Sequence, residues 1–124
     1  MNFSSNKPIY LQIANSIEDK VLSGELKPNE RVMSVRELGV EYEVNVNTAM
    51  RSIDFLAGND IIFNKRGIGY FVAEDAREKI IDLRRRNILK NEINYFFKQL
   101  SLLSIDAQKL TELYNDYLNG NKNA

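Results

Sequence analysis

A pair of predicted helices joined by a very short link limits the possible folds of this chain more than any other feature. Ser34 and Glu37 stand three residues apart, which is the spacing of a capping box, and predict a short helix that begins after the serine. Asn45 predicts the start of a second helix, because its short side chain can accept hydrogen bonds from the first turn. A link of about two residues makes the second helix cross the first steeply and leaves its first turn exposed.

A glycine-containing hairpin is predicted directly after the second helix. Two β-prone runs, at residues 61–65 and 68–72, flank a tight turn at Arg66-Gly67. A helix-turn-helix followed by such a hairpin is the order of parts in a winged helix, whose second helix enters the major groove of DNA. We therefore expect a DNA-binding surface made by the exposed helical turn and the basic tip of the hairpin. The candidate contact residues are Asn45, Asn47, Thr48, Arg51, Lys65 and Arg66.

An amphipathic helix is predicted upstream of this pair, because apolar residues recur every four positions from Ile9 to Val21. Gly24 is expected to end it. We interpret the apolar stripe, including Ile9 and Leu11, as part of the core, and we leave Tyr10 open as a surface or interface residue.

Two further helices are predicted after Val72. Apolar residues recur at helical spacing over 81–103 and 110–118, with a break at 104–106. The broad apolar face of this helical hairpin exceeds what about fifty residues can bury alone. The pair therefore either folds over the winged helix or meets the same pair in a second copy, and we favour the homodimer because symmetric dimers are the commonest soluble assembly. The predicted dimer interface comprises Ile88, Ile93, Phe96, Phe97, Leu100, Leu110, Leu113, Tyr114 and Tyr117.

These patterns predict a mainly α fold with one small β-hairpin, divided into a winged helix-turn-helix domain at residues 1–74 and a two-helix dimerisation tail at 75–124. The formal net charge is zero, with 17 basic and 17 acidic residues, which by itself argues against nucleic acid. The basic excess must therefore be local, and few phosphate contacts per protomer favour binding by two copies. The run Arg84–Arg86 is interpreted as a solvated helix face, with contact to phosphate as the alternative.

Cysteine and histidine are both absent, which excludes disulfides and thiolate metal sites and removes the commonest general base. Catalysis would need carboxylates or lysines alone, and no nucleophile with an adjacent base is recognisable. We therefore expect no enzyme, no metal and no cofactor. No apolar run is long enough to span a bilayer and no secretion signal is recognisable, so we expect no membrane partner and a cytoplasmic location.

Five stretches of the chain, in order, match the pattern of a known family. They are residues 8–13, 23–28, 34–38, 44–48 and 67–72, and on them the chain resembles the GntR family of bacterial transcription regulators, with a short tail similar to that of its YtrA-type subfamily. The resemblance implies that Arg36 and the residues opening the second helix contact DNA, and that a wing glycine and its basic neighbour contribute. These residues are Arg36, Asn45, Val46, Asn47, Thr48, Arg66 and Gly67.

The chain departs from the family pattern at several turns. The family usually has glycine where this chain has Asn29, Glu43 and Asp60, and proline where it has Met33 and Val46. Asparagine and aspartate tolerate a left-handed backbone, whereas glutamate is a less comfortable substitute.

The resemblance implies a compact dimeric repressor that binds a palindromic operator in double-stranded DNA, and the short tail is typical of relatives that control transporter operons. Two alternatives stay open. The near-neutral charge favours a winged helix used as a protein-interaction module, since a fold does not determine a function. Phe96, Phe97, Tyr114 and Tyr117 could instead line a cleft for a small-molecule effector, whose identity the sequence does not indicate.

Overall fold

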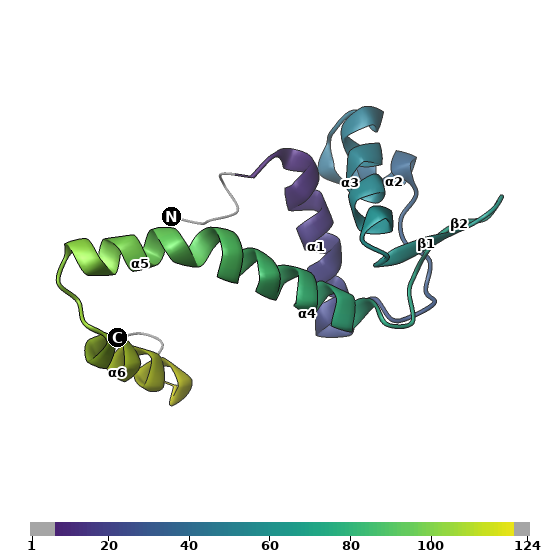
Figure 1. Ribbon diagram of the computed structural model, residues 1–124. Coiled ribbons are helices and arrows are strands. Elements are labelled where there is room, and N and C mark those ends of the chain that lie inside the picture. The colour runs from purple at the N-terminus through teal and green to yellow at the C-terminus, as the bar shows by residue number, and fades with distance from the viewer. Residues whose placement is uncertain (1–6, 121–124) are drawn as a thin grey trace. The chain divides into compact units, whose positions relative to one another are not determined.

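The computed structural model describes residues 7–120 and divides the chain into two compact units, residues 1–83 and 84–124 (Figure 1). The first six residues of the predicted N-terminal domain and the end of the polar tail, residues 121–124, lie outside the described residues. The chain is mainly helical, with one two-stranded antiparallel hairpin, as predicted.

The first helix of unit 1, α1, spans Ile9–Ser23. Its buried stripe includes Ile13, Ile17 and Val21, and Gly24 ends it in a left-handed conformation, as predicted. The expectation that Ile9 belongs to the core is wrong: its side chain is 52% exposed, because it lies in the first turn, at the end of the stripe.

Helices α2, Val35–Tyr42, and α3, Val46–Gly58, form the predicted helix-turn-helix. Both hydrogen bonds of the capping box are present: Glu37 N donates to Ser34 Oγ over 3.1 Å, and Ser34 N donates to Glu37 Oε1 over 2.8 Å. Asn45 caps α3, since its Oδ1 accepts from Thr48 N over 2.8 Å. Glu43 closes α2 with φ of 54°, the left-handed backbone for which glycine is best suited.

The hairpin consists of β1, Ile62–Lys65, and β2, Gly69–Val72, with Ile62 opposite Val72. Its turn is longer than predicted, because Ile68 belongs to the turn and its N–H donates to the Lys65 carbonyl over 2.9 Å. Figure 1 shows the hairpin extending away from α2 and α3.

A further segment pairs with β2 on its other edge, which the sequence analysis did not predict. Val32 N donates to the Tyr70 carbonyl over 2.8 Å, and Val72 N donates to the Glu30 carbonyl over 2.9 Å. This pairing connects the base of the hairpin to the link between α1 and α2. Strand β2 therefore has a hydrogen-bonded neighbour on each of its two edges.

The core of unit 1 extends beyond the winged-helix segments. Its largest buried side chains include Leu38, Ile53, Leu56 and Ile61. Helix α4, Ala76–Asn87, adds the fully buried Ala76 and Ile80. Compact packing therefore continues to residue 83, nine residues past the expected end of the DNA-binding domain.

The single long helix predicted for 81–103 is interrupted. A π-helical turn, η2, Ile88–Glu92, separates α4 from α5, Ile93–Leu102. The predicted break is confirmed at Ser104, which has φ of 57°. Asp106 then caps α6, Ala107–Leu118, by accepting from Lys109 N over 2.9 Å.

Unit 2 has no core of its own within the part that the structure describes. None of its residues 84–120 is buried, and α5 and α6 make at most slight contact with each other. None of the described helices combines the length and apolar character needed to cross a membrane.

Candidate nucleic-acid interface

The first two turns of α3 present a strip of exposed side chains. Val46, Asn47, Met50 and Arg51 are exposed, while the opposite face buries Ala49, Ser52, Ile53 and Leu56. The strip combines an amide, a guanidinium and two apolar groups. Such a surface can offer hydrogen bonds and apolar contacts to base edges.

Two of the predicted contact residues, Asn45 and Thr48, form the hydrogen bond that caps the start of α3. The Oδ1 atom of Asn45 is engaged by the Thr48 N–H, so only its amide nitrogen remains to donate to a partner. Thr48 itself is half-buried. Asn47 and Arg51 are therefore the polar side chains that the first two turns of α3 expose to solvent.

Arg51 is held by α1. Its guanidinium carbon lies 4.3 Å from the centroid of the Tyr10 ring, and the neighbouring Ser52 Oγ donates to the Tyr10 carbonyl over 2.8 Å. A cation over an aromatic face is attracted by the negative charge of the ring face. The sequence leaves Tyr10 open as a surface or interface residue, because its contact with Arg51 spans 41 residues and no local pattern encodes it.

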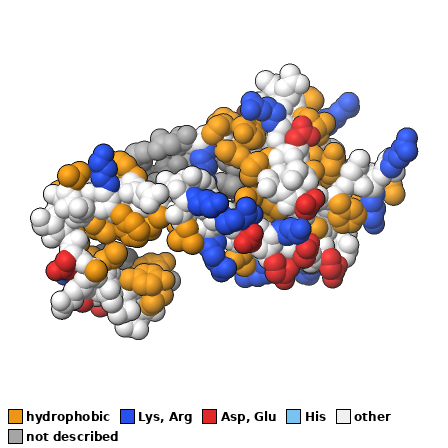
Figure 2. All heavy atoms as spheres, viewed as in Figure 1, with side chains coloured by type: hydrophobic (Ala, Val, Ile, Leu, Met, Phe, Trp, Pro, Cys, Tyr) orange, Lys and Arg blue, Asp and Glu red, His pale blue; other side chains and the backbone are white. Residues whose placement is uncertain are grey.

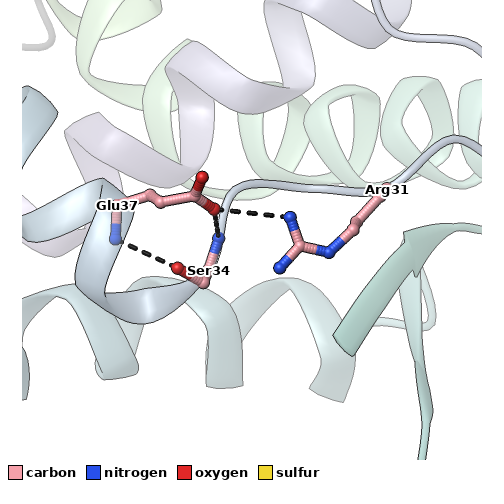
Figure 3. A network of polar contacts seen from close by, with 3 residues as sticks. All are labelled: Arg31, Ser34 and Glu37. Carbon is pink, nitrogen blue, oxygen red and sulfur yellow. Dashed lines mark hydrogen bonds and ion pairs between the residues drawn. The ribbon is translucent and has the colours of Figure 1, made fainter. Parts of the chain in front are cut away.

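Two arginines near the start of α2 differ in their availability. Arg36 is exposed and makes no hydrogen bond or ion pair with any residue that the structure describes. Arg31, by contrast, has its Nη1 3.4 Å from Glu37 Oε1 (Figure 3). Its Nε also lies 3.3 Å from the position that a Cβ would occupy at residue 69. Of the two, Arg36 is therefore the arginine whose guanidinium is available to a partner outside the chain.

The Glu37 carboxylate is stabilised in its charged form. Hydrogen bonds from the Ser34 backbone and then the Ser34 side chain lower the pKa of Glu37. Desolvation partly opposes them, and Arg31 lowers the pKa by a smaller amount than desolvation raises it. The three residues form one network around the start of α2 (Figure 3). The network therefore holds Arg31 close to the cap.

The hairpin carries its cations at the outer end. Lys65 Nζ lies 4.4 Å from the centroid of the Phe71 ring, which stacks on Phe63 with centroids 6.1 Å apart. Arg66 and Gly67 follow in the turn, where Gly67 has φ of 78° and both residues are exposed. Figure 2 shows Lys and Arg side chains at this free end of the hairpin.

The aromatic residues considered for a ligand cleft are all on the surface. Phe96, Phe97, Tyr114 and Tyr117 are between 46% and 61% exposed. A shallow cavity of about 150 Å³ lies instead in unit 1, with Ile17, Leu26 and Tyr42 among its lining residues.

None of the predicted dimer residues is fully buried in the single chain. Figure 2 shows hydrophobic side chains on the surface of α5 and α6. Ile93, Leu100 and Leu110 are half-buried. The exposed members are Ile88, Phe96, Phe97, Leu113, Tyr114 and Tyr117.

A helix-turn-helix with an exposed first turn on its second helix, followed by a hairpin with a basic tip, defines a winged-helix DNA-binding regulator. The family model for bacterial regulatory proteins of the gntR family matches residues 9–72. The chain belongs to the GntR family of transcription regulators, and neither the family nor its relatives are enzymes.

Relatives match nearly the whole chain as well as this segment. The HTH-type transcriptional regulator YhcF of Bacillus subtilis is 33% identical over 95% of this chain and 96% of its own length. The HTH-type transcriptional repressor YtrA of the same organism is 28% identical over 96% of this chain and 94% of its own. A crystal structure of a GntR-family regulator from Bacteroides thetaiotaomicron has a TM-score of 0.77 and 43% identity, covering 90% of this chain and 97% of that one.

Proposed function

We propose that this chain is a homodimeric repressor that binds a palindromic operator, each protomer inserting the first turns of α3 into the major groove of one half-site. The observation that carries the proposal is the exposed strip on α3, where Asn47 and Arg51 lie in the first two turns of the second helix of the helix-turn-helix. Asparagine and arginine are side chains that form paired hydrogen bonds with base edges. Half-sites about 34–36 Å apart would match the two-fold symmetry of the protein.

Contacts with the DNA backbone come from the elements on either side of α3. Arg36 on α2 is free to bind phosphate, and the wing offers Lys65 and Arg66. Gly67 lets the turn approach the DNA closely, since it has no side chain. Asn45 and Thr48 mainly shape the start of α3, and Val46 adds an exposed apolar side chain there.

The tail supports dimerisation. Unit 2 exposes large apolar side chains along α5 and α6, and Phe96, Phe97 and Tyr117 are each about half exposed. An apolar surface of this kind is unfavourable in water unless a partner covers it. A second copy of the tail is the partner that also supplies the second DNA-reading unit.

Two finer statements belong to the same proposal. The similarity to YtrA supports a repressor rather than an activator, and the short tail supports control of a transporter operon, as the family resemblance implies. Since the target is chromosomal DNA, we place the protein in the cytoplasm. The cavity in unit 1 is a candidate site for a small-molecule effector, and the proposed operator binding does not invoke one.

The proposal is tested by selecting bound sequences from random duplex DNA with the purified protein. We expect a two-fold symmetric motif, and we expect the affinity for it to fall steeply between two salt concentrations, because binding releases counterions from phosphate. Affinity that is insensitive to salt, or no enriched sequence, would favour a protein-interaction module instead.

Substitutions then assign the contacts. Arg36→Ala should weaken operator binding by about tenfold, which corresponds to roughly 1.4 kcal/mol for a charged contact. Lys27→Ala is the matched control, because Lys27 is exposed and follows the far end of α1, about 22 Å along that 15-residue helix from the turn that holds Tyr10. Equal affinities for the two variants would remove Arg36 from the interface.

A further inference from the structure

Two apolar side chains lie on the face of α3 that the proposed function places in the major groove. Val46 is 59% exposed and Met50 is 39% exposed, and they stand four residues apart, one above the other on the helix. Asn47 and Arg51 form a second pair at the same spacing beside them. The strip is therefore divided lengthwise into a polar half and an apolar half.

The fold gives no use for the apolar half. The core side of α3 is already filled by Ala49, Ile53 and Leu56, which are completely buried. The start of the helix is capped by Asn45, so Val46 is not needed there, and a β-branched residue is a weaker helix former than most. Solvent-exposed helix faces normally carry polar side chains.

The major groove offers one apolar group to such residues. Adenine, guanine and cytosine present hydrogen-bond donors and acceptors there, whereas thymine adds the C5-methyl group. Valine and methionine can contact a methyl group, whereas valine has no hydrogen-bonding group for a base edge and the methionine thioether is only a weak acceptor. A pair of them beside a polar pair therefore fits a sequence with thymine at the positions that they face.

We propose that Val46 and Met50 are specificity-determining residues that contact thymine methyl groups in each half-site of the operator. The proposal rests on the proposed function, because it requires α3 to enter the major groove. Met50 thereby acquires a role at the interface, and Val46 acquires a defined chemical partner rather than a general place in it.

The first test uses the unmodified protein. Each thymine of the selected operator is replaced in turn by deoxyuridine, which differs only in lacking the C5-methyl group, and the Kd is measured by fluorescence anisotropy. Burial of one methyl group corresponds to about a fourfold change in affinity. We expect one or two thymines in each half-site to show a loss of this size, while the other thymines of the site show little change.

The second test couples the methyl group to the side chain. In Val46→Ala and Met50→Ala, the sensitive thymines should lose their preference over deoxyuridine, because the apolar contact is already gone. Val40→Ala is the matched control: it is an equally small truncation of a 76% exposed apolar residue on α2, and it should keep the full effect of deoxyuridine. Thermal unfolding by circular dichroism checks that each variant is folded.

The outcomes separate the inference from the function on which it rests. If deoxyuridine has no effect at any position, if the selected half-sites contain no thymine, or if the effect persists in both variants, the methyl contact is refuted while sequence-specific binding stands. If folded wild-type protein enriches no DNA sequence, the proposed function fails, and the methyl contact fails with it.

Discussion

Two single residues at the ends of α2 affect the stability of this domain, one through a strained backbone and the other through its charge. Glu43 adopts φ of 54° at the end of α2, where a side chain with a Cβ crowds the backbone. Glu37, at the start of the same helix, is held in its charged form by Ser34 and Arg31. Each of these positions allows a measurement of stability that does not depend on DNA.

Replacing Glu43 by glycine should stabilise the domain. Removal of the Cβ relieves a left-handed conformation that costs roughly 1–2 kcal/mol, and the greater freedom of glycine in the unfolded chain offsets part of this gain. We expect the free energy of unfolding in urea to rise by about 0.5–1 kcal/mol. The control is Gly24→Ala, which introduces a Cβ at φ of 84° and should destabilise the domain. A less stable Glu43→Gly variant would contradict this account.

Replacing Glu37 by glutamine should change how stability depends on pH. The pKa of Glu37 is lowered in the folded state, so its negative charge stabilises the fold at pH values above its ordinary pKa of 4.5. This contribution is lost as the pH falls through the lower pKa of the folded state. The glutamine amide can still accept from Ser34 N, so only the charge is removed.

We expect wild type to be more stable than Glu37→Gln near neutral pH and the difference to shrink at acid pH. Urea unfolding of both proteins across that range provides the measurement. A difference independent of pH would mean that the charge is not the source.

At the scale of elements, α1 positions the reading helix. The Tyr10 ring lies under the Arg51 guanidinium, and Ser52 bonds to the Tyr10 carbonyl, so the two helices are joined at the point where α3 presents its polar strip. The segment before α2 similarly holds the hairpin by pairing with β2. Both contacts join different elements, and together they orient the candidate interface.

Removing the Tyr10 ring should weaken DNA binding. A cation–π contact at an exposed site is worth roughly 0.5–1 kcal/mol, so Tyr10→Ala should raise the operator Kd by about twofold to fivefold per half-site. Tyr10→Phe keeps the ring face and should bind like wild type. The Kd is measured by fluorescence anisotropy at a single salt concentration. Equal losses in both variants would show that the hydroxyl, rather than the ring, matters.

At the scale of the whole molecule, the two units differ in what they can stabilise alone. Unit 1 has a closed core that includes Leu38, Ile53 and Ile80, whereas the described residues of unit 2 bury none of their side chains. The free energy that keeps unit 2 folded must therefore come largely from a contact outside its own described packing. The proposed homodimer would supply that contact.

Phe97→Glu should dissociate the dimer. A charge placed in an apolar interface loses its hydration without gaining a partner, which is strongly unfavourable. Sedimentation should show a monomer, and the operator Kd should rise by at least about tenfold because the second half-site no longer adds to binding. Lys98→Glu, at the adjacent exposed position on α5, is the control and should remain dimeric. A dimeric Phe97→Glu protein would place the interface elsewhere.

Local signals in the sequence determined the elements of this protein. The capping box at Ser34, the cap at Asn45 and the turn at Gly24 each depend on groups within about four residues, so their structures follow from the sequence alone. The helical periodicity and the hairpin were predictable for the same reason. The candidate site was predictable as far as the residues that open α3 and the wing tip.

Only the tertiary structure decided which of those residues are held and which are free. Arg31 is engaged by Glu37 and Arg51 lies on Tyr10, while Arg36 stays available. The pairing of the segment before α2 with β2 and the burial of Ile80 in unit 1 could not be predicted from the sequence either. These features arise between segments far apart in the chain, and their energies depend on distances and burial that no local pattern encodes.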